Sequence, residues 1–181
     1  YSKQNRWVDS IYNNLDLEEK IGQLITVWVA TKYGEDEIKH ISKLIEDYKL
    51  GGLIFSLGDI KSQAKAINKF QKQSKVPLLI SMDAEWGIGM RLDDAFSFPY
   101  NMTLGAIEND SLIYQVGKRI GFHAKRLGVQ INFAPVVDIN TNPANPIIGF
   151  RSFGEDKYNV TNKALNYLKG MHHHGIMGAA K

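Results

Sequence analysis

The chain has 181 residues, a length that suits one domain with a real hydrophobic core. Hydrophobic residues make up 44% and charged residues 23%, which are ordinary values for a folded protein and argue against disorder. The net charge of +3 comes from scattered lysines, whereas a nucleic-acid partner would need a basic stripe. The absence of cysteine excludes disulfides and thiolate metal sites, and no apolar stretch is long enough to cross a membrane.

The amino-terminal third predicts two helical segments and a strand. Apolar residues at helical spacing predict a helix over residues 6–15, and Asp16 with Glu19 forms a capping box for a short turn at 16–20. The β-branched run at 21–29 predicts the first strand. The start of the chain, YSKQNRW, has neither an initiator Met nor a signal-peptide block, so we expect a mature or trimmed product.

The next segments alternate between helix and strand. An apolar stripe predicts a helix over 35–50 that ends at Gly51 and Gly52, followed by a strand at 53–55. Asp59 is expected to cap a further helix whose inward side carries Ala64, Ile67 and Phe70. The apolar run 78–80, which follows Pro77, predicts a third strand that is buried on both faces.

The second half repeats this alternation. A loop is expected at 92–102, and Asp110 is expected to cap a helix to Leu127, closed by Gly128, with Leu112 among its core residues. The remaining elements are predicted as a strand at 129–139, a loop rich in Asn and Pro, a helix at 159–173 with Leu165 on its core side, and a strand at 175–180.

This rhythm of strands and helices predicts an α/β fold with a parallel sheet or barrel. A complete eightfold barrel takes about 250 residues. Five strands and a stop at a strand end therefore predict that residues 1–181 are about the first five βα units of a (β/α)8 (TIM) barrel.

Asp83 is the strongest candidate for a site residue, because ligands of parallel α/β folds bind at the carboxyl ends of the strands. A carboxylate there can accept two hydroxyl hydrogen bonds from one sugar ring. The alternative is a strand-end acid that only caps the next helix. Arg91 and Arg151 lie in loops after the third and fourth strands, and each could bind a ligand or form an ordinary surface ion pair.

Two further acids have less certain roles. Asp138 could be a site residue, but we favour a structural anchor of the Asn-rich loop through its side chain. Glu85 is open between the same two roles. Residues 172–174 are three consecutive histidines, which point in different directions on a helix and are not expected to chelate a metal, and His123 is expected to be a packed or surface histidine.

Five motifs in order resemble the N-terminal domain of glycoside hydrolase family 3, in its β-N-acetylglucosaminidase branch. They are EKIGQL at 19–24, GGLIF at 51–55, MDAEWGIGMR at 82–91, NFAPVVDINTNP at 132–143 and NPIIGFRSFGED at 145–156. The ending GIMGAAK resembles the start of that family's Lys-His-Phe-Pro-Gly-His-Gly motif. One departure is Trp86-Gly87, where many members have two glycines.

The resemblance implies that Asp83 holds hydroxyls of the non-reducing sugar, and that Arg91, Arg151 and Lys181 are further substrate-binding residues. It implies a retaining, two-step hydrolysis of terminal N-acetylglucosamine, with a histidine as acid/base and an aspartate as nucleophile. Both would follow Lys181, so the 181 residues alone are expected to be inactive, with no metal or cofactor.

Other functions remain open at this point. The chain could belong to a family 3 β-glucosidase, or to a sugar-binding or structural module without catalysis. The expected partners are a carbohydrate, such as a peptidoglycan fragment or a chitin-like glycan in cell wall recycling, and the rest of the barrel. The expected location is the periplasm or the outside of a bacterium, with the cytoplasm as the alternative.

Overall fold

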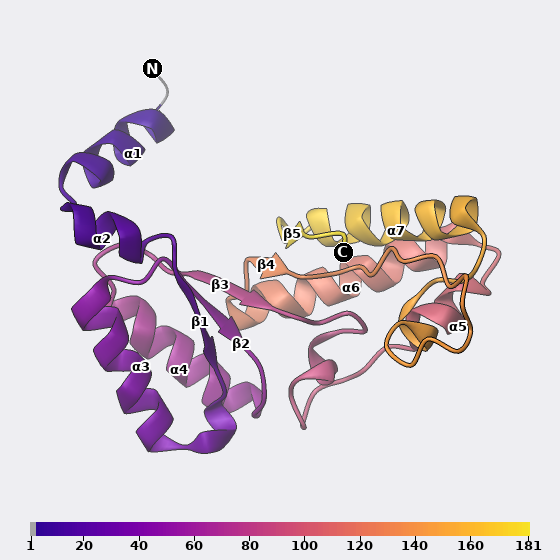
Figure 1. Ribbon diagram of the computed structural model, residues 1–181, viewed down its shortest axis with the longest axis horizontal. Coiled ribbons are helices and arrows are strands. Elements are labelled where there is room, and N and C mark those ends of the chain that lie inside the picture. The colour runs from indigo at the N-terminus through magenta and orange to yellow at the C-terminus, as the bar shows by residue number, and fades with distance from the viewer. Residues whose placement is uncertain (1–2) are drawn as a thin grey trace.

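The computed structural model describes residues 3–181, and its centre is a parallel five-stranded sheet in the order β1-β2-β3-β4-β5 (Figure 1). The strands are β1 (Thr26–Val29), β2 (Gly52–Phe55), β3 (Leu79–Met82), β4 (Ile131–Asn132) and β5 (Met177–Gly178). The α-helices are α1 (Lys3–Asn13), α2 (Leu17–Gly22), α3 (Glu35–Tyr48), α4 (Ile60–Gln73), α5 (Asn101–Gly105), α6 (Asp110–Leu127) and α7 (Lys157–His172). Short 3-10 helices are η1 (Thr31–Tyr33), η2 (Ile88–Met90) and η3 (Gly149–Arg151).

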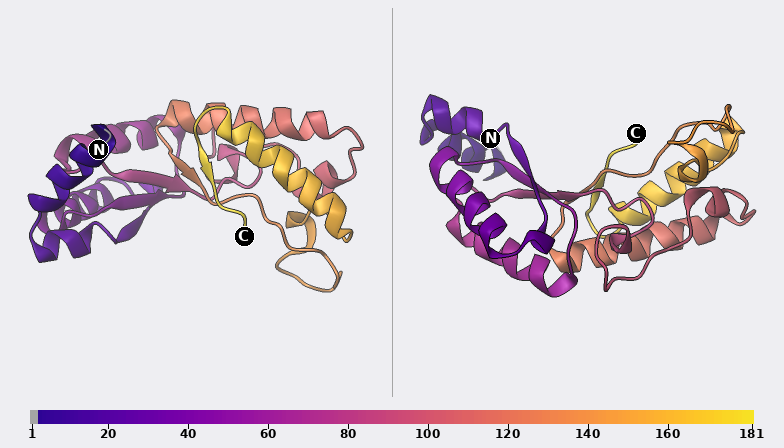
Figure 2. Two further views of the ribbon diagram at one scale, coloured as in Figure 1. Left: turned by 90° about the horizontal axis from the view of Figure 1, so that it is seen from above. Right: turned by 60° about the horizontal axis from the view of Figure 1, so that its bottom comes forward.

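Because each strand pairs with the next one in the chain, every crossover proceeds in the same direction, and right-handed crossovers then place the connecting helices on one face. The views in Figure 2 show this arrangement, with the helices following the outside of a curved sheet. The successive βα units and the curvature are those of an incomplete barrel wall, which confirms the α/β class and the five-strand order.

The two faces of the sheet have different environments. The register row Val29, Phe55 and Met82 faces the helices, and none of these side chains is more than 1% exposed. The adjacent row, two of whose members are Trp28 and Met177, lies on the concave face, where Trp28 is 44% and Met177 49% exposed. Side chains alternate along a strand, so Asp83, two positions after Ser81, belongs to this concave face at the carboxyl end of β3.

Several predicted boundaries were confirmed by local hydrogen bonds. The capping box of Asp16 and Glu19 is present at the start of α2, and the Asp59 carboxylate accepts the Ser62 backbone N–H at the start of α4. Gly128 closes α6 in the left-handed conformation at φ 86°.

The prediction of strand at 21–25 was wrong. Ile21 and Gly22 belong to α2, because the capping box starts a helix at Leu17 that continues through them. The chain then turns through the bond from the Ile25 N–H to the Gly22 carbonyl, 3.0 Å, and β1 begins at Thr26.

The predicted fourth and fifth strands were too long. β4 ends at Asn132, because the Ala134 N–H turns back to the Asn132 carbonyl (2.8 Å) and Pro135 has no N–H to donate. β5 begins at Met177, after Gly175 with φ of +75°.

Helix ends and faces also differ from the prediction. The α3 helix ends through Lys49 in the left-handed conformation instead of Gly51, Asn109 rather than Asp110 caps α6, and the predicted loop at 92–102 contains the start of α5. Leu112 and Leu165, predicted in the core, are 49% and 47% exposed. The other predicted core positions of these two helices include Ile113, Ile120, Val160 and Ala164, which are buried as expected. Among residues 3–181, the structure contains no helix long and apolar enough to span a bilayer.

Candidate active site

Two carboxylates and three cations meet where β3 ends. Asp83 directly follows β3, and its side chain is 25% exposed. Its Oδ1 lies 2.5 Å from the Lys181 Nζ, and its Oδ2 lies 3.4 Å from a terminal nitrogen of Arg91. Asp83 therefore lies beside Arg91 and Lys181, two of the basic residues that the resemblance groups with it.

The turn after β3 brings Arg91 back to the strand end. Gly87 adopts φ of +97°, which favours glycine, and the short helix η2 follows it directly. The Arg91 Nε then donates to the Asp83 backbone carbonyl at 3.0 Å, while the guanidinium faces the Asp83 carboxylate. Arg91 thus holds both the main chain and the side chain of Asp83.

Glu85 is the buried member of the cluster, with 1% exposure. Arg151 donates to both of its oxygens, from Nε to Oε2 at 3.0 Å and from Nη2 to Oε1 at 2.8 Å, and the Lys181 Nζ lies 3.1 Å from Oε1. Burial opposes ionisation of Glu85, but the hydrogen bonds and charges of Arg151 and Lys181 outweigh burial and hold its pKa below its ordinary value. Glu85 is therefore an ionised carboxylate that orients two cations.

Arg151 ends the short helix η3 in the Asn- and Pro-rich loop. Its hydrogen bonds to Glu85, together with the charges of Glu85, Asp138 and Asp83, raise its pKa against the opposing effect of partial burial. The Asn101 side chain donates to the Arg151 backbone carbonyl at 2.8 Å and so attaches this loop to α5.

Asp138 contacts the loop differently from the prediction. Its backbone carbonyl, not its side chain, accepts the Ser152 hydroxyl, at 2.5 Å. The carboxylate is on an exposed residue and contributes charge to Arg151. Asp138 thus contacts this loop through its main chain, whereas the prediction relied on its side chain.

Asn132 and Tyr167, which the sequence analysis missed, form hydrogen bonds with the main chain at Ala84 and Glu85. The Asn132 side-chain oxygen accepts the Ala84 N–H at 2.9 Å and its amide donates to the Ala84 carbonyl at 3.1 Å. The fully buried Tyr167 donates its hydroxyl to the Glu85 carbonyl at 3.0 Å, and burial raises its pKa. Asn132 is one of two amides in the predicted strand at 129–139, the other being Gln130. Tyr167 was not included in the predicted core face of α7.

Three aromatic side chains adjoin the charged cluster and were also missed. The Trp86 and Tyr100 rings are 4.8 Å apart, and those of Tyr100 and Phe150 are 4.4 Å apart. Tyr100 is 45% and Phe150 52% exposed. Trp86 follows Glu85 and Phe150 precedes Arg151 in the chain. Exposed aromatic faces beside hydrogen-bonding groups suit a sugar ring, which has apolar C–H and polar O–H surfaces.

Both carboxylates of the cluster face cations, Asp83 those of Arg91 and Lys181, and Glu85 those of Arg151 and Lys181. Within residues 3–181, no three His, Asp or Glu side chains are grouped as metal ligands, including His172 and its neighbours. The arrangement can instead offer both acceptors and charged donors to a ligand rich in hydroxyls.

Comparison with known proteins places this geometry in context. Residues 16–181 match the model of the glycosyl hydrolase family 3 N terminal domain. Beta-hexosaminidase A of Pseudoalteromonas piscicida is 35% identical over 154 residues, which cover 78% of this chain and 26% of that protein. The chain therefore spans only about a quarter of the length of this curated relative.

Two solved structures are similar over most of the chain. A glycoside hydrolase family 3 beta-N-acetylglucosaminidase from Paenibacillus sp. str. FPU-7 gives a TM-score of 0.82 at 34% identity, covering 92% of this chain and 33% of that one. The beta-glucoside phosphorylase BglX bound to 2FGlc gives a TM-score of 0.91 at 26% identity, covering 100% of this chain and 32% of that one.

Proposed function

Because the chain belongs to glycosyl hydrolase family 3 through its N-terminal domain, we propose that the whole protein is an exo-acting, retaining β-N-acetylglucosaminidase. In this proposal residues 1–181 supply the substrate-binding part of the barrel, truncated at the end of the fifth strand. The observation that carries it is the convergence of Asp83, Arg91 and Lys181 at the carboxyl end of β3, in a chain whose relatives include a beta-hexosaminidase.

The proposed roles follow from the contacts. The Asp83 carboxylate accepts hydrogen bonds from two neighbouring hydroxyls of the terminal sugar, in place of part of its present pairing with Lys181. Lys181 and Arg91, which already face that carboxylate, donate to the same sugar. Arg151 is held by Glu85 in a bidentate pair and donates from Nη1 to the Ile147 carbonyl at 3.3 Å, and its remaining N–H groups are proposed to donate to the sugar.

Such contacts accelerate a reaction only to the extent that they strengthen in the transition state. A retaining glycosidase passes through an oxocarbenium-like transition state, and hydrogen bonds to ring hydroxyls tighten as positive charge develops. A pre-positioned cluster loses little side-chain entropy when the sugar binds. The acid/base histidine and the nucleophilic aspartate are proposed to belong to the part of the protein that follows Lys181.

We further propose peptidoglycan fragments or chitin-like oligosaccharides as natural substrates, with a role in cell wall recycling. The proposed location is the periplasm or the outside of a bacterium, and the cytoplasm is the alternative. Cell fractionation followed by immunodetection distinguishes the two.

A second candidate activity is suggested by the similarity to a beta-glucoside phosphorylase, and it would use glucosides instead of N-acetylglucosaminides. The test is to measure release of nitrophenol by the full-length protein from the p-nitrophenyl β-glycosides of N-acetylglucosamine and of glucose. Each assay is run with and without inorganic phosphate. We expect the N-acetylglucosaminide to be the better substrate and phosphate to be unnecessary.

Preference for the glucoside, or a rate that requires phosphate, would replace the proposed activity with the second candidate. No release from either glycoside, by a protein shown to be folded, would favour a sugar-binding or structural module without catalysis.

A further inference from the structure

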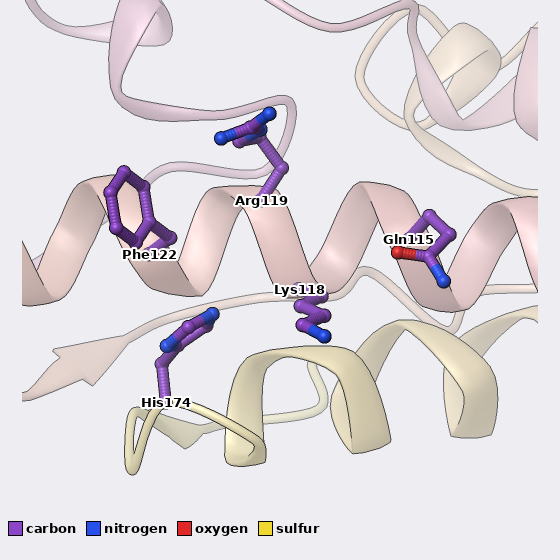
Figure 3. Close-up of a pocket in the computed structure, with 5 residues that line it drawn as sticks. All are labelled: Gln115, Lys118, Arg119, Phe122 and His174. Atoms are coloured by element: carbon purple, nitrogen blue, oxygen red, sulfur yellow. The ribbon is translucent and has the colours of Figure 1, made fainter.

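A basic pocket lies on the helical side of the sheet, away from the strand ends that carry Asp83. It is lined by Gln115, Lys118, Arg119, Phe122 and His174 and encloses about 310 Å³. Figure 3 shows that four of these residues come from α6, while His174 rises toward them from the turn after α7. The pocket therefore has two walls, one from α6 and one from the turn after α7.

The basic residues of α6 continue past the pocket as a stripe. Lys118, Arg119, Lys125 and Arg126 are spaced so that they fall on one side of the helix, and the stripe is about 12 Å long at the rise of an α-helix. We call these four residues with His174 the basic stripe. Arg119, Lys125 and Arg126 are exposed, and Lys118 is partly buried against the turn after α7.

Among the residues that the structure describes, no carboxylate forms an ion pair with these cations. None of the ion pairs found within residues 3–181 involves any of the four lysines and arginines of the basic stripe. The adjoining surface hollow is lined by Asp94 together with Arg126. The Asp94 Oδ1 accepts the Ile60 backbone N–H at 2.9 Å.

The aromatic ring at the centre of the stripe organises the cations. The guanidinium carbons of Arg119 and Arg126 lie 5.7 and 5.8 Å from the centroid of the Phe122 ring, within the range of a cation–π contact. The His174 ring lies 5.6 Å from the same ring in an edge-on arrangement. Phe122 thus holds two guanidinium groups and an imidazole around one apolar surface.

The groups that surround His174 are basic. Partial desolvation, with repulsion from His173, Lys118 and Lys125, lowers its pKa below the ordinary value. The groups that face it are therefore basic on both elements: Lys118 and Lys125 on α6, and His173 on its own turn. Tyr114 of α6 contacts His173 at 3.3 Å and adds no negative charge at neutral pH.

From these contacts we propose that the basic stripe binds a small polyanion that carries two or more phosphate or sulfate groups. Arginine and lysine are the side chains that bind tetrahedral oxyanions, and a row of cations about 12 Å long fits several linked charges better than one ion. The site is separate from the proposed sugar site and requires no part of the hydrolytic reaction.

The test measures binding to the full-length protein by isothermal titration calorimetry at low ionic strength. Two probes, sodium tripolyphosphate and a sulfated oligosaccharide, distinguish a phosphate source from a sulfate source. Two double variants are compared: Lys118→Gln with Arg119→Gln, and Arg119→Gln with Arg126→Gln, the second of which alters only exposed residues. The control is Lys65→Gln with Lys69→Gln, which removes two exposed cations from α4.

We expect at least one probe to bind, and each double variant to weaken binding by about tenfold or more, as expected for loss of charge-assisted hydrogen bonds. The control should bind like the wild-type protein, and circular dichroism should show all variants folded. Failure of both probes to bind, or equal loss in the control, would overturn the proposal. Weaker binding by Lys118→Gln with Arg119→Gln, together with unchanged binding by Arg119→Gln with Arg126→Gln, would also contradict binding along the whole stripe.

The contribution of His174 to anion binding can be measured separately, through the pH dependence of the affinity. Because an anion stabilises the imidazolium, binding should take up a proton, and affinity for the sulfated probe should rise as pH falls from 8 to 6. The His174→Gln variant should show a weaker pH dependence. An unchanged dependence would remove His174 from the site.

Discussion

At the scale of single residues, two carboxylates two positions apart have different tasks. Asp83 is 25% exposed and its oxygens are available to a ligand, whereas Glu85 is 1% exposed and bonded to Arg151 and Lys181. Lys181 lies against both acids, so it links the exposed group to the buried one. We interpret Glu85 as a positioning residue for the basic side chains and Asp83 as the group that contacts the sugar.

The first prediction concerns the stability that Glu85 contributes. Replacing Glu85 by Gln removes a buried charge and leaves Arg151 and Lys181 facing each other. The free energy of unfolding should therefore fall by about 2 kcal/mol. This value is smaller than for a fully buried pair because both cations are partly exposed. Urea unfolding of the full-length protein at pH 7 measures this, with Glu155→Gln, an exposed acid of the same loop, as control. Equal stability of Glu85→Gln and the control would refute a structural contribution of the pair.

The second prediction follows from the lowered pKa of Glu85. A group whose pKa is lower in the folded state stabilises the fold above its ordinary value of 4.5, and this stabilisation is lost as pH falls through the folded-state value. The stability difference between the wild-type protein and Glu85→Gln should therefore be constant near neutral pH and shrink below pH 4.5. A difference that stays constant down to pH 3 would contradict the assignment.

The residues of the site could be selected from sequence when they followed a strand. Asp83 stands directly after an apolar run, and Arg91 and Arg151 lie in loops of unusual composition, so they could be predicted together with Lys181. The pairing of Glu85 with Arg151 and Lys181 could not, because these residues are 66 and 96 positions away in the chain and pairing across such distances depends on the fold.

At the scale of elements, the contact between α6 and α7 is made by glycines. A Cβ atom added to Gly117 would lie 2.1 Å from the Tyr167 carbonyl oxygen, and one added to Gly170 would lie 2.2 Å from the Tyr114 carbonyl oxygen. The two helices therefore pack backbone against backbone. This close approach places Tyr167 under the Glu85 carbonyl, and so the helix pair supports the site.

The third prediction tests that contact. In an unhindered helix, Gly170→Ala would stabilise the protein by about 1 kcal/mol through helix propensity. Here the added methyl group would overlap the backbone of α6, so we expect destabilisation by about 2 kcal/mol or more. Thermal unfolding measures the effect, and Asn162→Ala, an exposed substitution in α7, is the control. A higher melting temperature for Gly170→Ala would show that the helices are not in this contact.

The type of each element could be predicted well, whereas the buried face of each helix could be predicted less well. The helix starts at Asp16 and Asp59 depend on hydrogen bonds to residues three positions on, so local sequence is sufficient. Leu112 and Leu165 were assigned to the core because an apolar side chain was taken to face inward. The glycines that decide the facing surfaces carry no hydrophobic signal, which is why the prediction included these two leucines and left the glycines out.

At the scale of the whole molecule, the concave face of the sheet is open in residues 3–181. Its large apolar side chains include Trp28, Leu79 and Met177, which are 44%, 49% and 49% exposed. In a closed barrel such side chains fill the interior. The parallel order and the curvature could be predicted from the βα rhythm, whereas the extent of exposure could not, because it depends on what faces the sheet.

The fourth prediction concerns the 181-residue chain expressed alone. Its open apolar face and unpaired strand edges should make it self-associate or precipitate, because such surfaces pair readily with other copies. Size-exclusion chromatography with light scattering measures the mass. A stable monomer at high concentration would speak against an incomplete barrel. The same chain should show no glycosidase activity, since the proposed nucleophile and acid/base residue lie outside it.

The central claim is that Asp83 holds the sugar, and its most direct test is the value of kcat/KM for p-nitrophenyl N-acetyl-β-glucosaminide in the full-length protein. Asp83→Asn keeps the shape of the side chain but removes the charge that strengthens its hydrogen bonds, so we expect a decrease of about 100-fold or more. The control Asp93→Asn, an exposed acid in the loop that follows Arg91, should match the wild-type protein. An Asp83→Asn protein that is folded and as active as the control would contradict the account.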